Sequence, residues 1–185
     1  LPVQSGSDKV LKLMNRKHTV SDYIQTYEKL EKINSSIKFS SDFIIGYPGE
    51  TLEDYKQTEK LIKNVKYINS YSFIFSARPG TPAFKLEKVN QSEAKERLIC
   101  FQSIAEQIKT KYRETLIGRI SNVLFENKTK DENKYFGRDQ HFNSIIVESN
   151  ENLTGKIKNV KITKLNQNTL FGEVSLEDNP KEHAA

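Results

Sequence analysis

Cysteine is almost absent from this sequence, with Cys100 the single example among 185 residues. One cysteine cannot close an internal disulfide, and it cannot alone hold a zinc ion or an iron–sulfur cluster. The three histidines (His18, His141 and His183) are scattered without metal-ligand or catalytic-triad spacing, so we interpret them as surface or loop residues. Cys100 falls within an amphipathic helical pattern, where a small core residue is expected.

Long hydrophobic runs are also missing. No apolar stretch approaches the roughly 20 residues needed to span a bilayer, and the first residues lack the basic segment and apolar core of a signal peptide. The chain begins with Leu1, in residues that resemble the end of a strand. We therefore expect a fragment of a longer cytoplasmic protein with no membrane partner.

Neither positive nor negative charge dominates the sequence strongly. The net charge is +5, and the excess lies in residues 1–112, which carry 18 basic and 13 acidic residues, whereas residues 113–185 carry 11 of each. A modest basic excess fits a nucleic-acid partner without demanding one.

The first 76 residues alternate between strand-like and helix-like patterns. Strands are expected at Leu1–Gln4, 37–45 and 71–75, and helices start near Ser7, Thr19 and Thr51, where Thr51 and Asp54 resemble a capping box. This order is typical of βα units with a parallel sheet. Three strands do not close a barrel, so residues 1–112, including a long connector helix from Ser92, are predicted to be the C-terminal half of a parallel α/β barrel.

The pattern changes after about Gly118. Short β-type runs follow at 120–125, 144–147, 160–165 and 170–174, separated by Gly, Asn and Asp. They predict a small all-β barrel of about five strands over residues 113–176, followed by a tail at 177–185.

The segment Asp42–Glu50 ends an apolar run in a Gly-x-Pro-Gly-Glu turn, directly before a helix start. Ligands of parallel α/β folds bind at such carboxyl ends of strands, and a glycine lets a ligand approach the main chain. Polar residues at successive strand ends should converge there, and they are Gln4, Ser5, Arg16, Asp42, Gly46, Gly49, Glu50 and Arg78. Plainer interpretations stay open: a solvated Asp42, an Arg16 favoured by a helix dipole, glycines that only form a turn, and a loop charge at Arg78.

In the second region, Lys156, Lys158, Lys161 and Lys164 form a basic run without an acid between them, and Lys128, Lys130, Lys134 and Arg138 precede it. Together with Tyr135, Phe136 and His141, they fit phosphate contacts and base stacking on RNA. An ordinary solvated face is the alternative, because the four lysines of the run do not share one strand parity.

Three segments carry a resemblance to the radical SAM methylthiotransferases: LPVQSGSDKVLKLMNRKHT, SSDFIIGYPGETLEDY and YSFIFSARPGTPA. Residues 113–176 resemble that family's TRAM domain, an RNA-binding β-barrel. The motif details favour the branch that acts on dimethylallyl-adenosine in tRNA over the branch that acts on a ribosomal protein. A sister branch acting on threonylcarbamoyl-adenosine is harder to separate.

The resemblance implies roles for particular residues. Gln4 and Asp42 match positions that contact the ribose or methionine part of S-adenosyl-L-methionine (SAM), and Arg16 matches the position that holds its carboxylate. Ser5 is expected in the same cofactor site. Ile44 to Gly46 match the strand beside the adenine. For RNA binding, the residues expected to contribute are Arg78, Lys128, Arg138, Lys156 and Lys158.

The chemistry implied is transfer of a methylthio group to carbon 2 of the adenine beside the anticodon, with SAM, two 4Fe–4S clusters and an electron donor. The family's cluster cysteines precede the region that the three segments match, and none lies in this chain. We therefore expect the isolated chain to be inactive, and name no catalytic residue. A non-catalytic RNA-binding protein is the alternative of another class.

Overall fold

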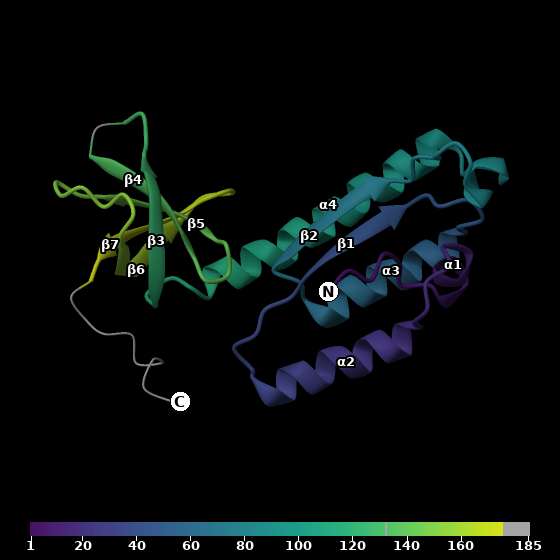
Figure 1. The fold of residues 1–185 in the computed structure, drawn as a ribbon, viewed down its shortest axis with the longest axis horizontal. Coiled ribbons are helices and arrows are strands. Elements are labelled where there is room, and N and C mark those ends of the chain that lie inside the picture. Colours follow the sequence, from purple (N-terminus) through teal and green to yellow (C-terminus); the bar gives the residue numbers. More distant parts are fainter. Residues whose placement is uncertain (132, 176–185) are drawn as a thin grey trace. The chain divides into compact units, whose positions relative to one another are not determined.

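The computed structural model describes residues 1–131 and 133–175. Within these ranges the chain forms two compact units, Leu1–Lys109 and a second that begins at Thr110 (Figure 1). The division lies shortly before the boundary at residue 112 that the sequence suggests. Each unit has its own buried core, so the two are described in turn.

The helices of the first unit begin where local capping signals stand in the sequence. They are α1 (Asp8–Leu13), α2 (Val20–Ile33), α3 (Leu52–Val65) and α4 (Gln91–Glu114), with a 3-10 turn at Pro82–Lys85; α4 continues into the second unit. Thr19 caps α2 and Thr51 caps α3, each with an aspartate three residues later that accepts from the cap amide. The capping box at Thr51 and Asp54 is therefore confirmed.

Two parallel strands form the sheet of the first unit. They are β1 (Ser40–Ile45) and β2 (Asn69–Ile74). The strand expected at the N-terminus is reduced to a single parallel bridge between Gln4 and Phe43. Strand β1 is also shorter than the predicted 37–45, because regular pairing with β2 starts only at Ser40.

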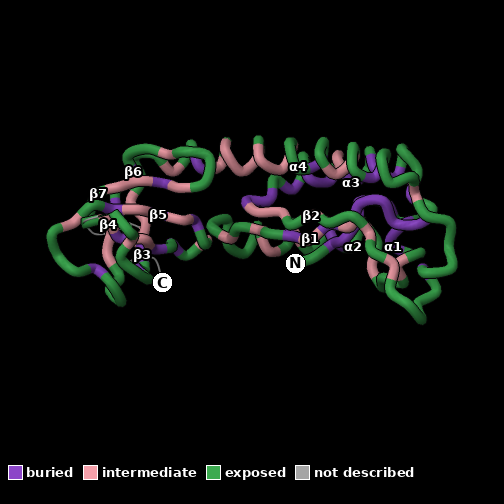
Figure 2. The backbone as a smooth tube through the Cα atoms, turned by 90° about the horizontal axis from the view of Figure 1, so that it is seen from above, coloured by how far each residue is buried: buried purple, intermediate pink, exposed green. Residues whose placement is uncertain are grey.

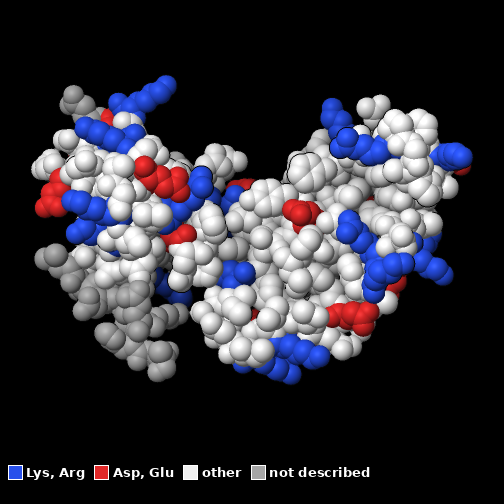
Figure 3. Space-filling model, viewed as in Figure 1, with Lys and Arg blue, Asp and Glu red and all other residues white. Residues whose placement is uncertain are grey.

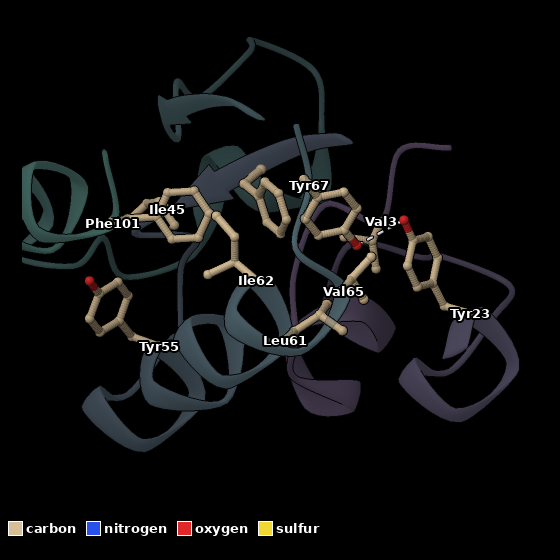
Figure 4. Close-up of a cluster of buried hydrophobic side chains, with 10 residues drawn as sticks. Val3, Tyr23, Ile45, Tyr55, Leu61, Ile62, Val65, Tyr67 and Phe101 are labelled. Carbon is tan, nitrogen blue, oxygen red and sulfur yellow. Dashed lines mark hydrogen bonds between the residues drawn. The ribbon is translucent and has the colours of Figure 1, made fainter. Parts of the chain in front are cut away.

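One face of β1 packs on the helices of the unit. Phe43 is fully buried, and its ring lies 4.7 Å from that of Phe101 and 5.6 Å from that of Tyr67. The Tyr67 hydroxyl donates to the Tyr23 hydroxyl at 2.8 Å, drawn as a dashed line in Figure 4. Figure 2 shows buried backbone along β1, whereas exposed stretches lie mainly in loops and on the outer turns of helices. This core fixes which face of β1 is left for a ligand.

The second unit is a closed five-stranded barrel. Its strands are β3 (Ile120–Lys128), β4 (Lys134–Asp139), β5 (Ser144–Glu148), β6 (Ile157–Leu165) and β7 (Leu170–Val174), and they pair in the order β3-β4-β5-β7-β6. All pairs are antiparallel except β5 with β7. Closure removes the exposed strand edges that invite aggregation, and the predicted barrel is confirmed.

The β3–β4 pair depends on Gly137. A Cβ at this position would lie 2.5 Å from the Leu124 carbonyl oxygen and 2.7 Å from Val123 Cγ1. Leu124 and Phe125 pair with Arg138 and Gly137, next to a register shift after Phe125. Only glycine permits this close approach of the two backbones.

The structure corrects the prediction that Tyr135 helps to stack RNA bases. About five barrel strands were predicted, but only four were located in the sequence. The strand that was not located is β4, which contains Tyr135 and Phe136 and was described only as a diluted basic run. Side chains alternate along a strand, so Tyr135 points into the barrel core whereas Phe136 lies outside. The alternation was hidden in the sequence because the outward position 136 carries a phenylalanine and the inward positions 137 and 139 carry glycine and aspartate.

Cys100 is exposed, so its prediction as a core residue is wrong. The apolar side of α4 that packs on the sheet includes Phe101, Ile104, Ala105 and Ile108. Cys100 lies at the edge of this side, about 100° around the helix from the buried Phe101.

No helix within the described ranges is long and apolar enough to cross a membrane. His18 and His141 lie in loops and are half-buried, in line with the loop placement expected for them. The tail at 177–185, with His183, lies outside the described residues.

Candidate cofactor site and nucleic-acid interface

Gln4 and Asp42 lie side by side at the start of the sheet. The Gln4 amide nitrogen donates to the Asp42 carbonyl, and the Ile44 nitrogen donates to the Gln4 carbonyl, both at 3.0 Å. Gln4 has φ +77°, in the left-handed region that non-glycine residues rarely adopt. These two backbone bonds hold Gln4 in that conformation. Among the described residues, neither the Gln4 side-chain amide nor the Asp42 carboxylate has a partner, so both are available to a ligand.

The free face of the sheet combines Asp42 with two exposed aromatic rings. Asp42 pairs with Tyr71 and Ile44 pairs with Phe73, so all four side chains lie on the face opposite the core. Tyr71 and Phe73 are 57% and 59% exposed. These rings were not predicted as site residues, although their alternation along the strand was a usable signal.

Arg16 follows α1, whose end is fixed against the turn after β1. The Tyr47 hydroxyl donates to the Leu13 carbonyl at 3.1 Å, and Asn15 takes φ +58° to reverse the chain. The Arg16 guanidinium is exposed and has no ion pair or hydrogen bond to a described residue. A guanidinium in this position can bind a carboxylate with two parallel hydrogen bonds.

A buried ion pair holds the turn at Gly46. Glu50 Oε1 accepts from the Gly46 amide at 3.1 Å and from Arg97 Nη1 at 3.0 Å. Burial raises the pKa of Glu50, against the lowering by the hydrogen bonds from Arg97 and Gly46. Gly46 has φ +73°, and a Cβ there would lie 2.7 Å from the Cβ of Ala94. Glu50, expected at the mouth of the site, instead supports the turn, and its partner Arg97 was not predicted from the sequence.

The hydroxyl of Ser5 is occupied by structural contacts. It accepts from the Ser7 amide at 3.2 Å and lies 3.4 Å from Thr58 Oγ1 on α3. Ser7 in turn donates to Asp54 Oδ1 at 2.7 Å. Ser5 therefore lies where the sequence places it, in the loop after the first bridge, but its side chain faces α3.

Asp54 links three segments of the first unit. Its carboxylate accepts from Lys9 Nζ at 2.8 Å and from Ser7 and Thr51, and Lys9 also donates to the Gly49 carbonyl at 2.9 Å. Burial works to raise the pKa of Asp54, but the hydrogen bonds from Lys9, Thr51 and Ser7 together hold it well below the ordinary 3.8.

The low pKa of Asp54 predicts a stability that depends on pH. A group whose pKa is lower in the folded state contributes stability above its unfolded pKa and loses it as the pH falls through the folded value. We expect Asp54→Asn to be less stable than the wild type at pH 7 and the difference to shrink steadily below about pH 4. Urea unfolding at pH 7, 5 and 3 measures this. A difference that grows toward acid pH would contradict the assignment. Asp22→Asn at the exposed cap of α2 is the comparison variant: hydrogen bonds from Thr19 also lower the pKa of Asp22, so the same direction is expected, without the contribution of Lys9 and Ser7.

Arg78 lies in the loop that follows β2. Its carbonyl accepts from the Thr81 hydroxyl at 2.7 Å, and its side chain is exposed. The loop is drawn to the Gly46 turn by Phe75, whose ring lies 4.7 Å from that of Tyr47. Arg78, Arg16 and Gly46 thus belong to segments that meet at the carboxyl end of the sheet, whereas Gln4 and Asp42 lie nearer its start.

Four of the predicted RNA-binding residues lie on neighbouring strands of the barrel. Lys156 and Lys158 flank the start of β6, where the Lys156 carbonyl accepts from the Phe125 amide at 3.0 Å and Lys158 pairs with Val123 of β3. Arg138 pairs with Leu124 on the other side of β3, and Lys128 ends β3. On the face of the barrel that Figure 3 shows, Lys and Arg side chains lie among Asp and Glu.

Lys161 and Lys164 lie farther along β6. Lys161 pairs with Ile120 of β3 and with Glu173 of β7, and Lys164 pairs with Phe171 of β7. Lys158 pairs with the core residue Val123, whereas Lys161 is exposed and has the opposite strand parity, so these lysines do not form one stripe on a single face.

Two family models match the chain, one in each unit. Residues 1–62 match the radical SAM superfamily, and residues 114–175 match the TRAM domain. Radical SAM membership implies SAM and iron–sulfur chemistry. The unpartnered groups of Gln4, Asp42 and Arg16 fit the hydroxyls, ammonium and carboxylate of SAM. In contrast, the described part of the chain has no group of three His, Cys, Asp or Glu side chains that could hold a metal, so these residues do not fit a cluster.

Homologous proteins match both units together. The tRNA-2-methylthio-N(6)-dimethylallyladenosine synthase of Pelagibacter ubique (strain HTCC1062) is 53% identical over 95% of this chain and 39% of its own length. Those of Buchnera aphidicola subsp. Baizongia pistaciae and Rickettsia felis are each 42% identical, over 97% and 94% of the chain and 41% and 40% of their own lengths. The chain thus spans about two-fifths of these relatives. It therefore contains a radical SAM segment and a TRAM domain, and it is homologous over nearly its whole length to part of these synthases.

Proposed function

We propose that the protein carrying this chain transfers a methylthio group to carbon 2 of dimethylallyl-adenosine beside the anticodon of tRNA. The observation that carries the proposal is the 53% identity to a tRNA-2-methylthio-N(6)-dimethylallyladenosine synthase, which extends over 95% of the chain and so includes both units. A protein that only binds RNA would not need the segment that matches the radical SAM superfamily. A bacterial cytoplasm is the expected location of such an enzyme.

The first unit contributes the SAM-binding side of the site in this proposal. Asp42 and the Gln4 amide bind the ribose or methionine part, and Arg16 binds the carboxylate. The strand from Ile44 to Gly46 lies along the adenine, and the exposed rings of Tyr71 and Phe73 exclude water from the same face. Because the Ser5 hydroxyl is committed to Ser7 and Thr58, Ser5 acts by shaping the loop beside Gln4.

Two 4Fe–4S clusters and a reductant complete the proposed enzyme, with ligands outside the described residues. When bound, they supply the reductive cleavage of SAM that leads to hydrogen abstraction from carbon 2, and the sulfur that replaces the hydrogen. Within this chain, the residues bind and orient: Arg16 and Asp42 fix SAM, and the fixed Gly46 turn sets the depth of its adenine. We assign no proton transfer to a residue of this chain.

The second unit binds the anticodon stem-loop in this proposal, with Arg78 of the first unit as a further contact. Lys128, Arg138, Lys156 and Lys158 supply positive charge for phosphates. We expect Lys156→Ala to weaken RNA binding and to lower the slope of log K against log salt by roughly 1, because one phosphate contact is lost. Titration of an RNA stem-loop at several salt concentrations measures both. An unchanged slope would remove Lys156 from the interface, and Lys38→Ala, an exposed lysine of the first unit, is the control.

A complementation experiment tests the proposed reaction. The full-length gene is expressed in a bacterium that lacks its own methylthiolating enzyme, and total tRNA is digested and analysed by mass spectrometry. We expect the methylthio derivative of dimethylallyl-adenosine to appear. Modification of threonylcarbamoyl-adenosine or of a ribosomal protein instead would move the substrate within the family. The absence of every such product would favour a protein that only binds RNA.

A further inference from the structure

Two apolar side chains lie next to each other on the outside of the barrel, surrounded by charge. Leu124 of β3 pairs with Ile157 of β6, and they are 46% and 66% exposed. On its other side, Leu124 pairs with Arg138 of β4. These three outward positions form one continuous row across β6, β3 and β4, and we call this row with Phe136 the β6–β3–β4 patch.

Arg138 is held in place within the patch. Its guanidinium carbon lies 5.5 Å from the centre of the Phe136 ring, and Nη1 lies 3.6 Å from Glu126 Oε1. A guanidinium packed on an aromatic ring presents its other flat face outward, and such planes stack on nucleobases. The patch therefore combines a planar cation with an apolar surface beside it.

Charge around the patch indicates the kind of partner that it fits. Lys156 is exposed directly before Ile157, whereas Lys158 pairs with the core residue Val123 and so lies on the other face of β6. The carboxylate adjacent to Arg138 is Glu126, which is paired with it. A nucleotide offers a flat, largely apolar base joined to an anionic phosphate, which matches an apolar row with the Arg138 guanidinium at one end and the exposed Lys156 next to the other.

We propose that the β6–β3–β4 patch binds one unpaired base of the RNA, which packs on Leu124 and Ile157 and stacks on the Arg138 guanidinium. This inference rests on the proposed tRNA function and adds a mode of recognition to it. The lysines supply affinity for any RNA backbone, whereas the patch distinguishes a loop with unstacked bases from a duplex. Paired bases present only their edges, so a duplex cannot reach this surface with a base face.

The test measures the affinity of the 185-residue chain for two RNAs. One is a hairpin with an unpaired loop, and the other is a blunt duplex of equal length. For the double variant Leu124→Ala and Ile157→Ala, we expect roughly tenfold weaker binding of the hairpin, the scale of one lost base stack. Duplex binding and the salt slope should stay unchanged, because no phosphate contact is removed. Lys156→Ala should behave in the opposite way and weaken both RNAs with a lower salt slope.

Arg138→Lys is a second variant, which keeps the positive charge and removes the planar guanidinium group. We expect it to weaken hairpin binding several-fold without changing the salt slope, since stacking is the interaction lost. Val174→Ala, an exposed apolar residue on β7, is the matched control and should leave both RNAs unaffected. Circular dichroism confirms that each variant keeps its fold.

Three results would overturn the inference. If the wild type binds the hairpin and the double variant binds it equally well, the patch has no role while the proposed function stands. If the wild type binds neither RNA, the tRNA-binding role of the barrel fails together with the patch. If the double variant keeps its RNA affinity but changes the oligomeric state, the patch is a contact between protein copies.

Discussion

Replacing Arg97 with methionine should lower the free energy of unfolding of the first unit by about 3–5 kcal/mol, because one partner of a buried ion pair is removed. The Glu50 side chain is 1% exposed and that of Arg97 is 11% exposed. Without Arg97, the Glu50 carboxylate keeps only the Gly46 amide among its present donors. Burial already raises the pKa of Glu50, so the variant must either bury an unpaired charge or take up a proton.

The double variant Glu50→Gln and Arg97→Met distinguishes the effect of the unpaired Glu50 charge from the effect of the changed side-chain packing. A glutamine oxygen can still accept from the Gly46 amide, and no unpaired charge remains, so the double variant should recover much of the lost stability. Lys95→Met, an exposed position on the same helix, is the control. Urea unfolding gives all values. A loss below about 1 kcal/mol, the range of surface ion pairs, would show that the pair is open to water.

The second large effect is expected at Phe43. Truncation of a fully buried phenylalanine to alanine costs about 3–5 kcal/mol, because both transfer energy and packing are lost. The Phe43 ring contacts Tyr67 and Phe101, and its backbone pairs with Gln4. Phe43→Ala should therefore lower the melting temperature of the chain and also loosen the loop that carries Gln4.

Phe73→Ala is the matched control for Phe43→Ala. Both residues lie on adjacent strands of the same sheet, but Phe73 is on the free face and 59% exposed. Its truncation in the 185-residue chain should cost less than about 1 kcal/mol, as usual for a surface position. Equal losses for the two variants would contradict the strand register, which places the two rings on opposite faces of the sheet.

Features set by neighbours in the sequence could be predicted. The capping box of Thr51 and Asp54 depends on four consecutive residues, and the βα order of the first unit follows from apolar periodicity. Four of the five barrel strands were also recognisable as short apolar runs. The strand β4 was not, because its inward positions after Tyr135 carry Gly137 and Asp139 and its outward position 136 carries a phenylalanine.

Features set by distant residues could not be predicted. Glu50 and Arg97 are 47 residues apart, and nothing local indicates that they pair. Leu124 and Ile157 become neighbours only when the barrel closes. The helical periodicity around Cys100 was real, but the side of α4 that packs on the sheet depends on the sheet's position. The candidate site residues remain a prediction. The place of Asp42 near the start of β1, the burial of Glu50 and the occupied Ser5 hydroxyl required the structure.

The most direct test of the central claim is an in vitro reaction of the full-length protein, with clusters reconstituted without oxygen and with SAM, reductant and tRNA carrying dimethylallyl-adenosine. Mass spectrometry of the digested tRNA should detect the methylthio nucleoside with the wild type. Arg16→Ala and Asp42→Asn should abolish or strongly reduce it, whereas Lys17→Ala, an exposed neighbour of Arg16, should not. Full activity of both site variants, or no methylthio product with the wild type, would contradict the account.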